Sequence, residues 1–396
     1  MNSQSNRPDL RSAFRYSAGY FAAFFAVGMV IASLGPTLPS LAENLNISLS
    51  SAGFLFTARS LGYLLGSLLV GRGYDRFPGN QLMAYLLFVA ALIMFFIPIT
   101  PFLYLVAGLL LVTGVCLGGN DVGGNTLVMW AFGDKSAPSL NAMYLFAGVG
   151  GLISPLVIGR FLIAGLDFKW AYWMLGVLIL PVALWLVTRP SPERRSSTHS
   201  TTSGQVNYLI VAFVGILFFI YVGIEVSFSG WIYTFTITSN LGSISTAAIL
   251  TSVFWMALTF GRIIAIPIAS RVHPMTILRG NLIGALLSLG LILMLPNSIY
   301  TVVIGTVGFG ISLASNFPST YSLAERHLDI SGRLTGLLWS CGSLGAMFTP
   351  WFIGHFMERL SPIALVATLF IYVCIGLGVL AGFYYYTRKS SSLSTG

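Results

Sequence analysis

The sequence contains very little charge. Only 8% of its 396 residues are Asp, Glu, Lys or Arg, while 56% are hydrophobic. A water-soluble domain carries about 25% charged residues. The composition therefore excludes a soluble globular protein and predicts one that lies in a lipid bilayer.

Cysteines and catalytic motifs are also scarce. The three cysteines, Cys116, Cys341 and Cys374, all lie in hydrophobic stretches, where we expect free packing residues and no disulfide or metal site. The hydrophilic segments contain no phosphate-binding glycine loop, no nucleophile with a base at a catalytic spacing, and no cluster of metal ligands. We therefore expect no enzymatic activity, ATP hydrolysis included, and no bound cofactor.

Long hydrophobic runs fill the chain instead. A helix that crosses a membrane needs about 20 mostly apolar residues. Twelve such stretches are centred near residues 26, 61, 90, 116, 150, 178, 218, 257, 286, 310, 344 and 373. The sequence predicts an all-α membrane protein with twelve transmembrane helices.

The basic residues predict the orientation of these helices. If both termini are cytoplasmic, 15 of the 20 Lys and Arg residues fall in cytoplasmic segments, as the positive-inside rule requires. This bias explains the net charge of +9, so we expect no nucleic-acid partner. We predict a multi-pass protein of an inner or plasma membrane, with both termini in the cytoplasm.

The chain repeats itself at a period of about half its length. The segment Gly150–Phe161 matches Gly345–Phe356 at its Gly, Pro, Ile, Gly and Phe positions. Nearly the same offset pairs Gly66 with Gly261, Arg76 with Arg271 and Asn120 with Asn316. A duplication predicts two parallel six-helix bundles, residues 1–187 and 206–396, joined by a Ser/Thr-rich cytoplasmic linker at 188–205.

Six plus six helices around a cytoplasmic linker resemble the major facilitator superfamily. The loop after the second stretch, from Gly71 to Gly79, resembles the Gly-x-x-x-Asp-Arg gating signature of that superfamily. The resemblance implies gating residues Gly71, Asp75 and Arg76, a binding site near the bilayer midplane, and alternating access by rocking of the halves. Asn80 and Gln81 stand where basic residues usually follow, and we expect a structural role for Asp75 and Arg76.

The fourth hydrophobic stretch contains an acid among polar residues, Gly118–Asn125. Ionisable residues inside a span are costly and usually face a water-filled cavity, where they bind ions, protons or substrate. Asn125 follows Asp121 by four residues and shares its helix face. We predict a coupling-ion site made of Asp121, Asn125 and Asn120. Oxygen ligands suit sodium, and a buried carboxyl suits a proton, so both ions stay open.

Three further charged side chains lie within hydrophobic stretches: Arg59, Glu225 and Arg262. We predict that they bind substrate. The alternative is two structural ion pairs, one in each half, Arg59 with Asp121 and Arg262 with Glu225.

The remaining candidates for substrate binding are polar and aromatic. Tyr221, Glu225 and Ser229 follow one another at four-residue spacing and share a helix face. To them we add Asn316, Trp255 and Trp339, whereas Trp231 is expected to anchor the helix at the membrane interface. Such a set of groups suits a polyhydroxylated solute such as a sugar.

Two segments resemble a narrower group of transporters. Asp121–Val128 with the following Gly133–Pro138, and Tyr221–Trp231, are similar to the sodium-dependent glucose transporter family and extend to the proton-coupled fucose symporters. The resemblance implies that Asp121 is the coupling carboxylate.

These features together predict a secondary active transporter that acts as a monomer in the bilayer. We expect it to carry a sugar or similar small polar solute by symport with sodium or protons. The alternatives are a proton-driven exporter of drugs or metabolites and a transport-inactive membrane sensor or scaffold.

Overall fold

The computed structural model describes residues 10–194, 207–328 and 332–394, and within them the chain forms helices and no strand. The first half contains α1 (Leu10–Asn44), α2 (Leu49–Leu65), the π-helical turn η1 (Gly66–Val70), α3 (Gly71–Tyr74), α4 (Gly79–Phe96), η2 (Ile97–Ile99), α5 (Leu103–Phe132), η3 (Gly133–Lys135), α6 (Ala137–Ile163) and α7 (Lys169–Val187). The second half contains α8 (Tyr208–Thr238), α9 (Ile244–Ala269), α10 (Pro274–Met294), α11 (Ile299–Leu313), α12 (Asn316–Glu325), α13 (Gly332–Arg359) and α14 (Ala364–Ser394).

The helices confirm the predicted all-α membrane architecture. Eleven helical segments of the described residues are long and apolar enough to cross a membrane. The remaining long helix, α13, has 28 residues and packs between α2 and α8. Each predicted hydrophobic stretch therefore corresponds to a helix, and eleven of the twelve qualify as candidate spans.

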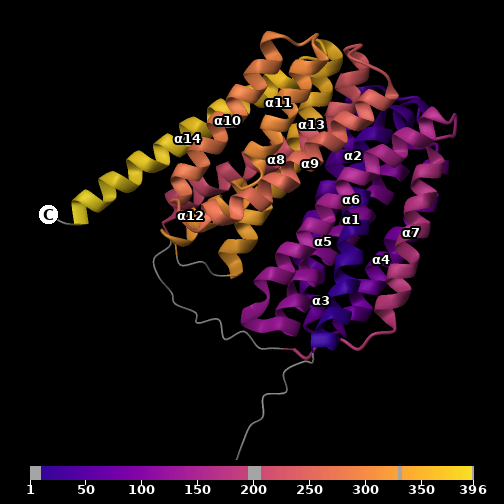
Figure 1. The fold of residues 1–396 in the computed structure, drawn as a ribbon, viewed down its shortest axis with the longest axis horizontal. Coiled ribbons are helices and arrows are strands. Elements are labelled where there is room, and N and C mark those ends of the chain that lie inside the picture. Colours follow the sequence, from indigo (N-terminus) through magenta and orange to yellow (C-terminus); the bar gives the residue numbers. More distant parts are fainter. Residues whose placement is uncertain (1–9, 195–206, 329–331, 395–396) are drawn as a thin grey trace, which may run out of the picture.

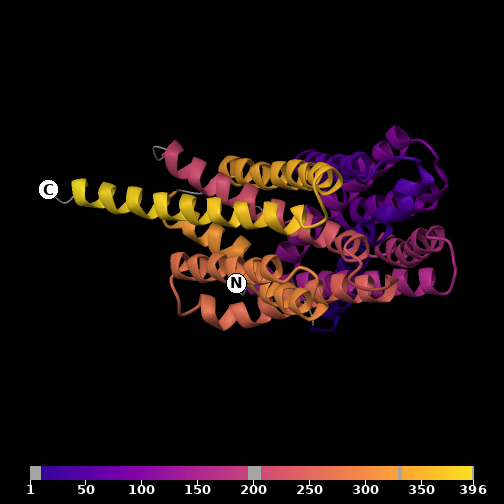
Figure 2. The same cartoon turned by 90° about the horizontal axis from the view of Figure 1, so that it is seen from above.

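The two halves form separate groups of helices (Figure 1). We call the end of the helices that carries residues 10, 194 and 207 the linker end, and the opposite end the far end. In Figure 1 the groups meet in the upper part of the view and diverge towards the lower part, where α3 lies at the linker end of the first half. Seen from above, α14 extends past the other helices at its C-terminal end (Figure 2). Most of the predicted linker, residues 195–205, lies outside the described residues.

The internal repeat is visible in the way the helices pack. A Cβ at Gly150 would lie 2.1 Å from the carbonyl oxygen of Phe25, and a Cβ at Gly345 would lie 2.0 Å from that of Phe219. Glycine thus lets α6 touch the backbone of α1, and its repeat partner lets α13 touch α8. Small residues allow such close helix contacts in membranes.

The repeated helices also hold the halves together. Helix α6 packs on α9 of the other half, and α13 packs on α2. Hydroxyl groups of α2 bond to α13 across this interface, since Thr57 donates to the carbonyl of Met347 at 2.7 Å and Ser60 to that of Ala346 at 3.2 Å. The two interfaces are related by the same duplication that the sequence records.

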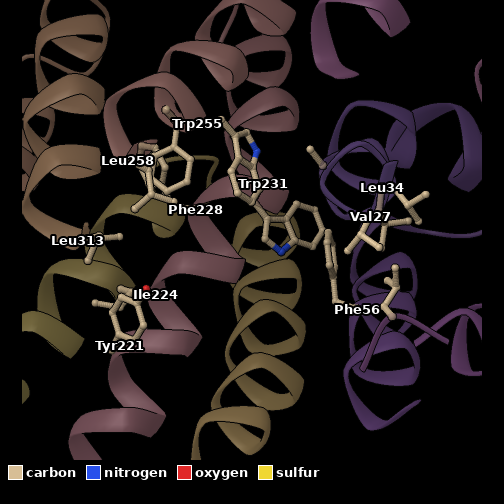
Figure 3. Close-up of a cluster of buried hydrophobic side chains, with 14 of the residues drawn as sticks. Val27, Leu34, Phe56, Tyr221, Ile224, Phe228, Trp231, Trp255, Leu258 and Leu313 are labelled. Carbon is tan, nitrogen blue, oxygen red and sulfur yellow. The ribbon is translucent and has the colours of Figure 1, made fainter. Parts of the chain in front are cut away.

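Trp231 lies in the α2/α13 interface and not at the membrane surface. It is 0% exposed, its Nε1 donates to the carbonyl of Pro350 at 2.9 Å, and its ring packs on Phe56 of α2 at 5.9 Å between centroids (Figure 3). The prediction of an interfacial anchor was wrong, because hydrophobicity along one helix does not reveal which neighbouring helix covers it.

The tenth span is broken, whereas its repeat partner is continuous. Helix α11 ends at Leu313 and α12 begins at Asn316. Pro318 has no N–H to donate to the carbonyl of Ala314, four residues before it, which interrupts the helical hydrogen bonds. In α5 the equivalent position is Val122, and the helix runs on.

The glycines after Asp121 serve packing. A Cβ at Gly123 would lie 1.9 Å from the hydroxyl of Tyr74, and one at Gly124 would lie 2.3 Å from the ring of Phe24. Both positions therefore need glycine for side chains of α3 and α1 to approach α5. The helix does not unwind beside Asp121.

Candidate functional site

Asp121 is held by two tyrosines from neighbouring helices. The hydroxyl of Tyr63 on α2 donates to Oδ2 at 2.8 Å, and that of Tyr144 on α6 donates to Oδ1 at 3.1 Å. The side chain is 8% exposed. An ionised carboxylate has about four acceptor sites, so both oxygens keep capacity for a further ligand.

Asn125 supports this arrangement from the next turn of α5. Its Nδ2 donates to the hydroxyl of Tyr144 at 2.7 Å and to the backbone carbonyl of Asp121 at 2.8 Å. Because the Tyr144 hydroxyl accepts from Asn125, its own proton is directed to Asp121. Asn125 therefore orients Tyr144, which in turn orients the carboxylate.

Asn120 does not join this cluster. Its Nδ2 donates to the carbonyl of Cys116 in its own helix at 2.8 Å, and its Oδ1 is buried without a partner among the described residues. The residue is 1% exposed. Adjacent positions of a helix point about 100° apart, which explains why Asn120 and Asp121 have separate surroundings.

Arg59 does not pair with Asp121. Its Nη1 donates to the carbonyl of Ile31 on α1 at 2.9 Å, and its guanidinium lies 5.8 Å from the ring centroid of Phe56. Arg59 is 9% exposed. The alternative prediction of a structural Arg59–Asp121 pair is therefore wrong, and no basic side chain in the described part of the chain forms a salt bridge with Asp121.

Glu225 and Arg262 do form the second predicted pair. Arg262 Nη2 lies 3.7 Å from Glu225 Oε1, and Tyr221 donates a hydrogen bond to Oε2 of the same carboxylate. The Tyr221 hydroxyl thus shares the Glu225 carboxylate with Arg262. The Arg262 side chain is 35% exposed and that of Glu225 is 18% exposed, so this ion pair is long and partly open.

The packing of α6 on α9 brings the two charged groups close to one another. Along this antiparallel interface Gly159 faces Ala248, Gly151 faces Trp255 and Gly148 faces Thr259. The next turn of both helices places Tyr144 opposite Arg262, and these two groups are close enough to interact electrostatically. Asp121 of one half and the Glu225–Arg262 pair of the other therefore belong to one site.

The other predicted residues lie in less direct positions. Trp255 packs on Gly151, with its Nε1 buried and unpaired among the described residues. Ser229 donates to Val226 of its own helix at 3.2 Å. Trp339 packs edge-on to Phe317 at 5.1 Å.

Asn316 begins α12, immediately after the break in the tenth span. Its Oδ1 accepts a hydrogen bond from Asn281 at 2.9 Å, and Asn281 also donates to Ser315 at 2.8 Å. Asn316 lines a small cavity together with Tyr221. The amide is thus held at the helix break, on the side towards the Glu225 cluster.

Tyr63 and Tyr144 were missed by the sequence reasoning. The sequence contains 17 tyrosines, and nothing in the local pattern distinguishes these two from packing residues. Their role depends on the side-by-side placement of α2, α5 and α6.

The predicted gating loop lies at the linker end. Asp75 and Arg76 are exposed and form no salt bridge among the described residues. The backbone carbonyls of Asp75 and Phe77 accept hydrogen bonds from Arg194, at 2.5 Å and 3.3 Å. The start of the linker is therefore docked on this loop.

The far end carries a bond between the halves. The backbone N–H of Ser50, in the first turn of α2, donates to Glu358 Oε2 in the last turn of α13 at 2.8 Å. A carboxylate at a helix N-terminus satisfies a free N–H and interacts favourably with the helix dipole. Glu358 thus links the halves where they meet.

Replacing Glu358 with alanine is expected to open the far end more often. Loss of this cap favours separation of α2 from α13 by about two- to fivefold, the usual effect of an exposed cap. Spin labels at Phe102→Cys and Leu360→Cys, in a variant without the native cysteines, measure the separation by electron-electron resonance. Glu43→Ala, which removes another exposed acid at this end, is the matched control. Equal distance distributions for Glu358→Ala and Glu43→Ala would contradict a latch.

Comparisons with known proteins agree with this architecture. Residues 20–350 match the family model of the Major Facilitator Superfamily. The chain is 27% identical to the mouse sodium-dependent glucose transporter 1A, over 91% of this chain and 92% of that protein. The fold is similar to that of the xylose transporter XylE from E. coli, with a TM-score of 0.76 and 15% identity over 94% of this chain and 97% of that one. It is also similar to the nucleoside transporter NupG, with a TM-score of 0.72 and 13% identity over 94% and 98% of the two chains.

Proposed function

This chain belongs to the major facilitator superfamily, and on that premise we propose that it is a secondary active transporter that carries a sugar, or a similar small polar solute, together with sodium or a proton. The observation that carries the proposal is Asp121, a buried carboxylate that two tyrosines hold and that forms no salt bridge among the described residues. A buried charge of this kind needs a counter-ion or a proton.

Asp121 is the coupling group in this proposal. Sodium takes oxygen ligands, as calcium and magnesium do, and the carboxylate with the hydroxyls of Tyr63 and Tyr144 supplies them. A proton on Asp121 would neutralise the same charge. Asn125 sets the direction of the Tyr144 hydroxyl, whereas Asn120 bonds to its own helix and gives the site no visible support.

The substrate is proposed to bind between the halves, next to the Glu225–Arg262 pair. Carboxylate, guanidinium and phenol groups from Glu225, Arg262 and Tyr221 can bond to sugar hydroxyls, and Asn316 adds an amide from the broken span. Trp255 and Trp339 offer flat apolar surfaces. Arg59 and Ser229 have intramolecular partners and would need to change them to bind substrate. Two similar proteins are named as a glucose transporter and a xylose transporter, and these names support a sugar as the substrate.

The linker end is proposed to face the cytoplasm, as the distribution of basic residues predicts. The far-end contacts between the halves then close the outer side, so that the described conformation gives access from the cytoplasm. Gly71, Asp75 and Arg76 stay candidates for the gate at that side.

Uptake by purified protein in liposomes tests this function. Labelled glucose, xylose and a nucleoside are offered separately, each under an inward sodium gradient and, in other vesicles, under an inward proton gradient. Accumulation of a sugar that depends on one gradient is expected. Accumulation only under an outward-directed proton gradient, set up in further vesicles, would indicate an exporter that exchanges substrate for protons. Absence of any flux would support a sensor or scaffold.

Neutralising Glu225 and Arg262, singly and together, tests whether their ion pair is only structural or also takes part in transport. Glu225→Gln and Arg262→Gln are each expected to reduce uptake roughly tenfold, because each leaves a charge without its partner in a partly open site. The double variant is expected to stay impaired, since both groups also serve the site. Initial uptake rates at equal protein content measure this, and full recovery in the double variant would reduce the pair to a structural one.

A further inference from the structure

Asp121 and Arg262 carry opposite charges on opposite halves of the protein, and Tyr144 bonds to the first and faces the second. The Tyr144 hydroxyl donates to Asp121 Oδ1 at 3.1 Å, and the α6/α9 register places Arg262 opposite Tyr144. The other titratable groups at this point are Tyr63 on α2 and Tyr221 and Glu225 on α8. No basic side chain of the described residues forms a salt bridge with Asp121 in this conformation.

The bond that holds Arg262 in this conformation is weak. Its distance of 3.7 Å to Glu225 exceeds the 2.7–2.9 Å that is typical of charge-assisted hydrogen bonds. The Arg262 side chain is 35% exposed. Glu225, in contrast, keeps a second partner in Tyr221 when Arg262 leaves. Arg262 can therefore move without leaving the Glu225 carboxylate unbonded.

We propose that Arg262 exchanges between Glu225 and Asp121, with Tyr144 as the positioning residue between them, so that cation binding at Asp121 controls the closure of the linker end. This exchange rests on the proposed function of Asp121 as the coupling group. It goes beyond it by naming the group of the other half that responds.

The charge of Asp121 determines where Arg262 lies. An ionised Asp121 without a cation is a buried unpaired charge, which costs several kcal/mol, and Arg262, across the α6/α9 interface, is a guanidinium that can offset it. Movement of Arg262 towards Asp121 draws the linker end of α9 against α5 and α6 and closes that end. A sodium ion or proton on Asp121 removes the attraction, Arg262 returns to Glu225, and the linker end opens.

In the cycle that follows, the charge of Asp121 determines which end of the protein is open. The empty, charged protein favours a closed linker end and therefore an open far end. Cation binding favours the conformation described here, in which the halves meet at the far end. A ligand shifts such an equilibrium only by its differential affinity for the two states, and Arg262 supplies the difference.

Spin labels at the linker end test the exchange without any substrate. Lys135→Cys and Arg271→Cys, both exposed, report the separation of the halves in a variant without native cysteines. In choline chloride at alkaline pH, wild type is expected to populate a short distance. Addition of sodium chloride, or in a separate arm a decrease in pH, is expected to reduce that population about tenfold.

The variants give opposite expected results. Arg262→Gln and Asp121→Asn lose the short distance about tenfold in every buffer, whereas Glu225→Gln increases it, because Arg262 is then free for Asp121. Tyr144→Phe keeps the short distance and changes the sodium concentration or pH at which it is lost. Arg160→Gln, an exposed arginine of α6, is the matched control and behaves as wild type. Arg262→Lys, which keeps the charge, restores part of the response and shows that loss in Arg262→Gln is not misfolding.

Two failures are distinguishable. If wild type and Asp121→Asn differ in their response but Arg262→Gln responds as wild type does, Asp121 remains the coupling group and the exchange is overturned. If wild type responds to neither sodium nor pH, the proposed coupling is overturned and the exchange with it.

Discussion

Replacement of Asp121 by asparagine is expected to abolish cation-driven accumulation of substrate, a loss on the order of 100-fold. Asparagine keeps the size of the side chain and an oxygen that can accept from Tyr63, but it has no charge to bind sodium and no proton to release. Downhill exchange of labelled for unlabelled substrate is expected to persist, because a roughly tenfold loss of the state with a closed linker end slows the rocking of the halves without stopping it. The measurement compares uphill uptake and exchange in the same liposomes.

Two controls accompany the Asp121 variant. Asp121→Glu keeps the charge and is expected to retain partial accumulation with an altered cation dependence. Asp167→Asn removes an acid whose partner is Lys169 in a far-end turn and is expected to leave uptake unchanged. Accumulation by Asp121→Asn against a gradient would exclude Asp121 as the coupling group.

Replacement of Trp231 by alanine is expected to give the second largest effect, on the far-end interface. The side chain is 0% exposed and fills the space between α13 and α2. Removing a fully buried tryptophan costs about 3–5 kcal/mol, but only its contacts with α2, at Phe56 and beside Gly53, are lost when the far end opens. We therefore expect a shift of about 1 kcal/mol, or roughly fivefold, towards the open far end, together with lower thermal stability in detergent.

A conservative variant separates the effect of Trp231 on thermal stability from its effect on opening of the far end. Trp231→Phe removes the hydrogen bond to Pro350 and keeps an aromatic ring against Phe56, so it is expected to lose stability while the distance between labels at Phe102→Cys and Leu360→Cys stays near that of wild type. A Trp231→Ala protein with an unchanged label distance would show that other contacts close the far end.

Part of the site could be predicted because its signals are local. A carboxylate inside an apolar span is conspicuous, and Asn125 follows at the spacing that a helix brings onto one face. The Glu225–Arg262 pair was predicted as an alternative for the same reason, since both charges stand out against apolar neighbours. The Arg59–Asp121 pair was wrong because a backbone carbonyl of α1 satisfies Arg59, and no helical periodicity reports a partner of that kind.

The break in the tenth span could also have been predicted from the sequence. Pro318 lies in the middle of a hydrophobic stretch whose repeat partner has valine, and proline interrupts a helix for a known reason. Gly123 and Gly124 are a different case, since α5 is continuous through them. Only the close approach of Tyr74 and Phe24 reveals that these glycines serve packing.

The sequence by itself predicted a membrane environment, an all-α fold of long apolar helices, and Asp121 as an acid inside one of these helices. These properties depend on hydrophobicity along the chain, which is one-dimensional. The tertiary structure decided the partners: two tyrosines around Asp121, Trp231 between the halves, and Arg262 opposite Tyr144. Partners depend on which helix faces lie together, and in a bilayer, where all faces are apolar, that choice is made by shape and by a few polar groups.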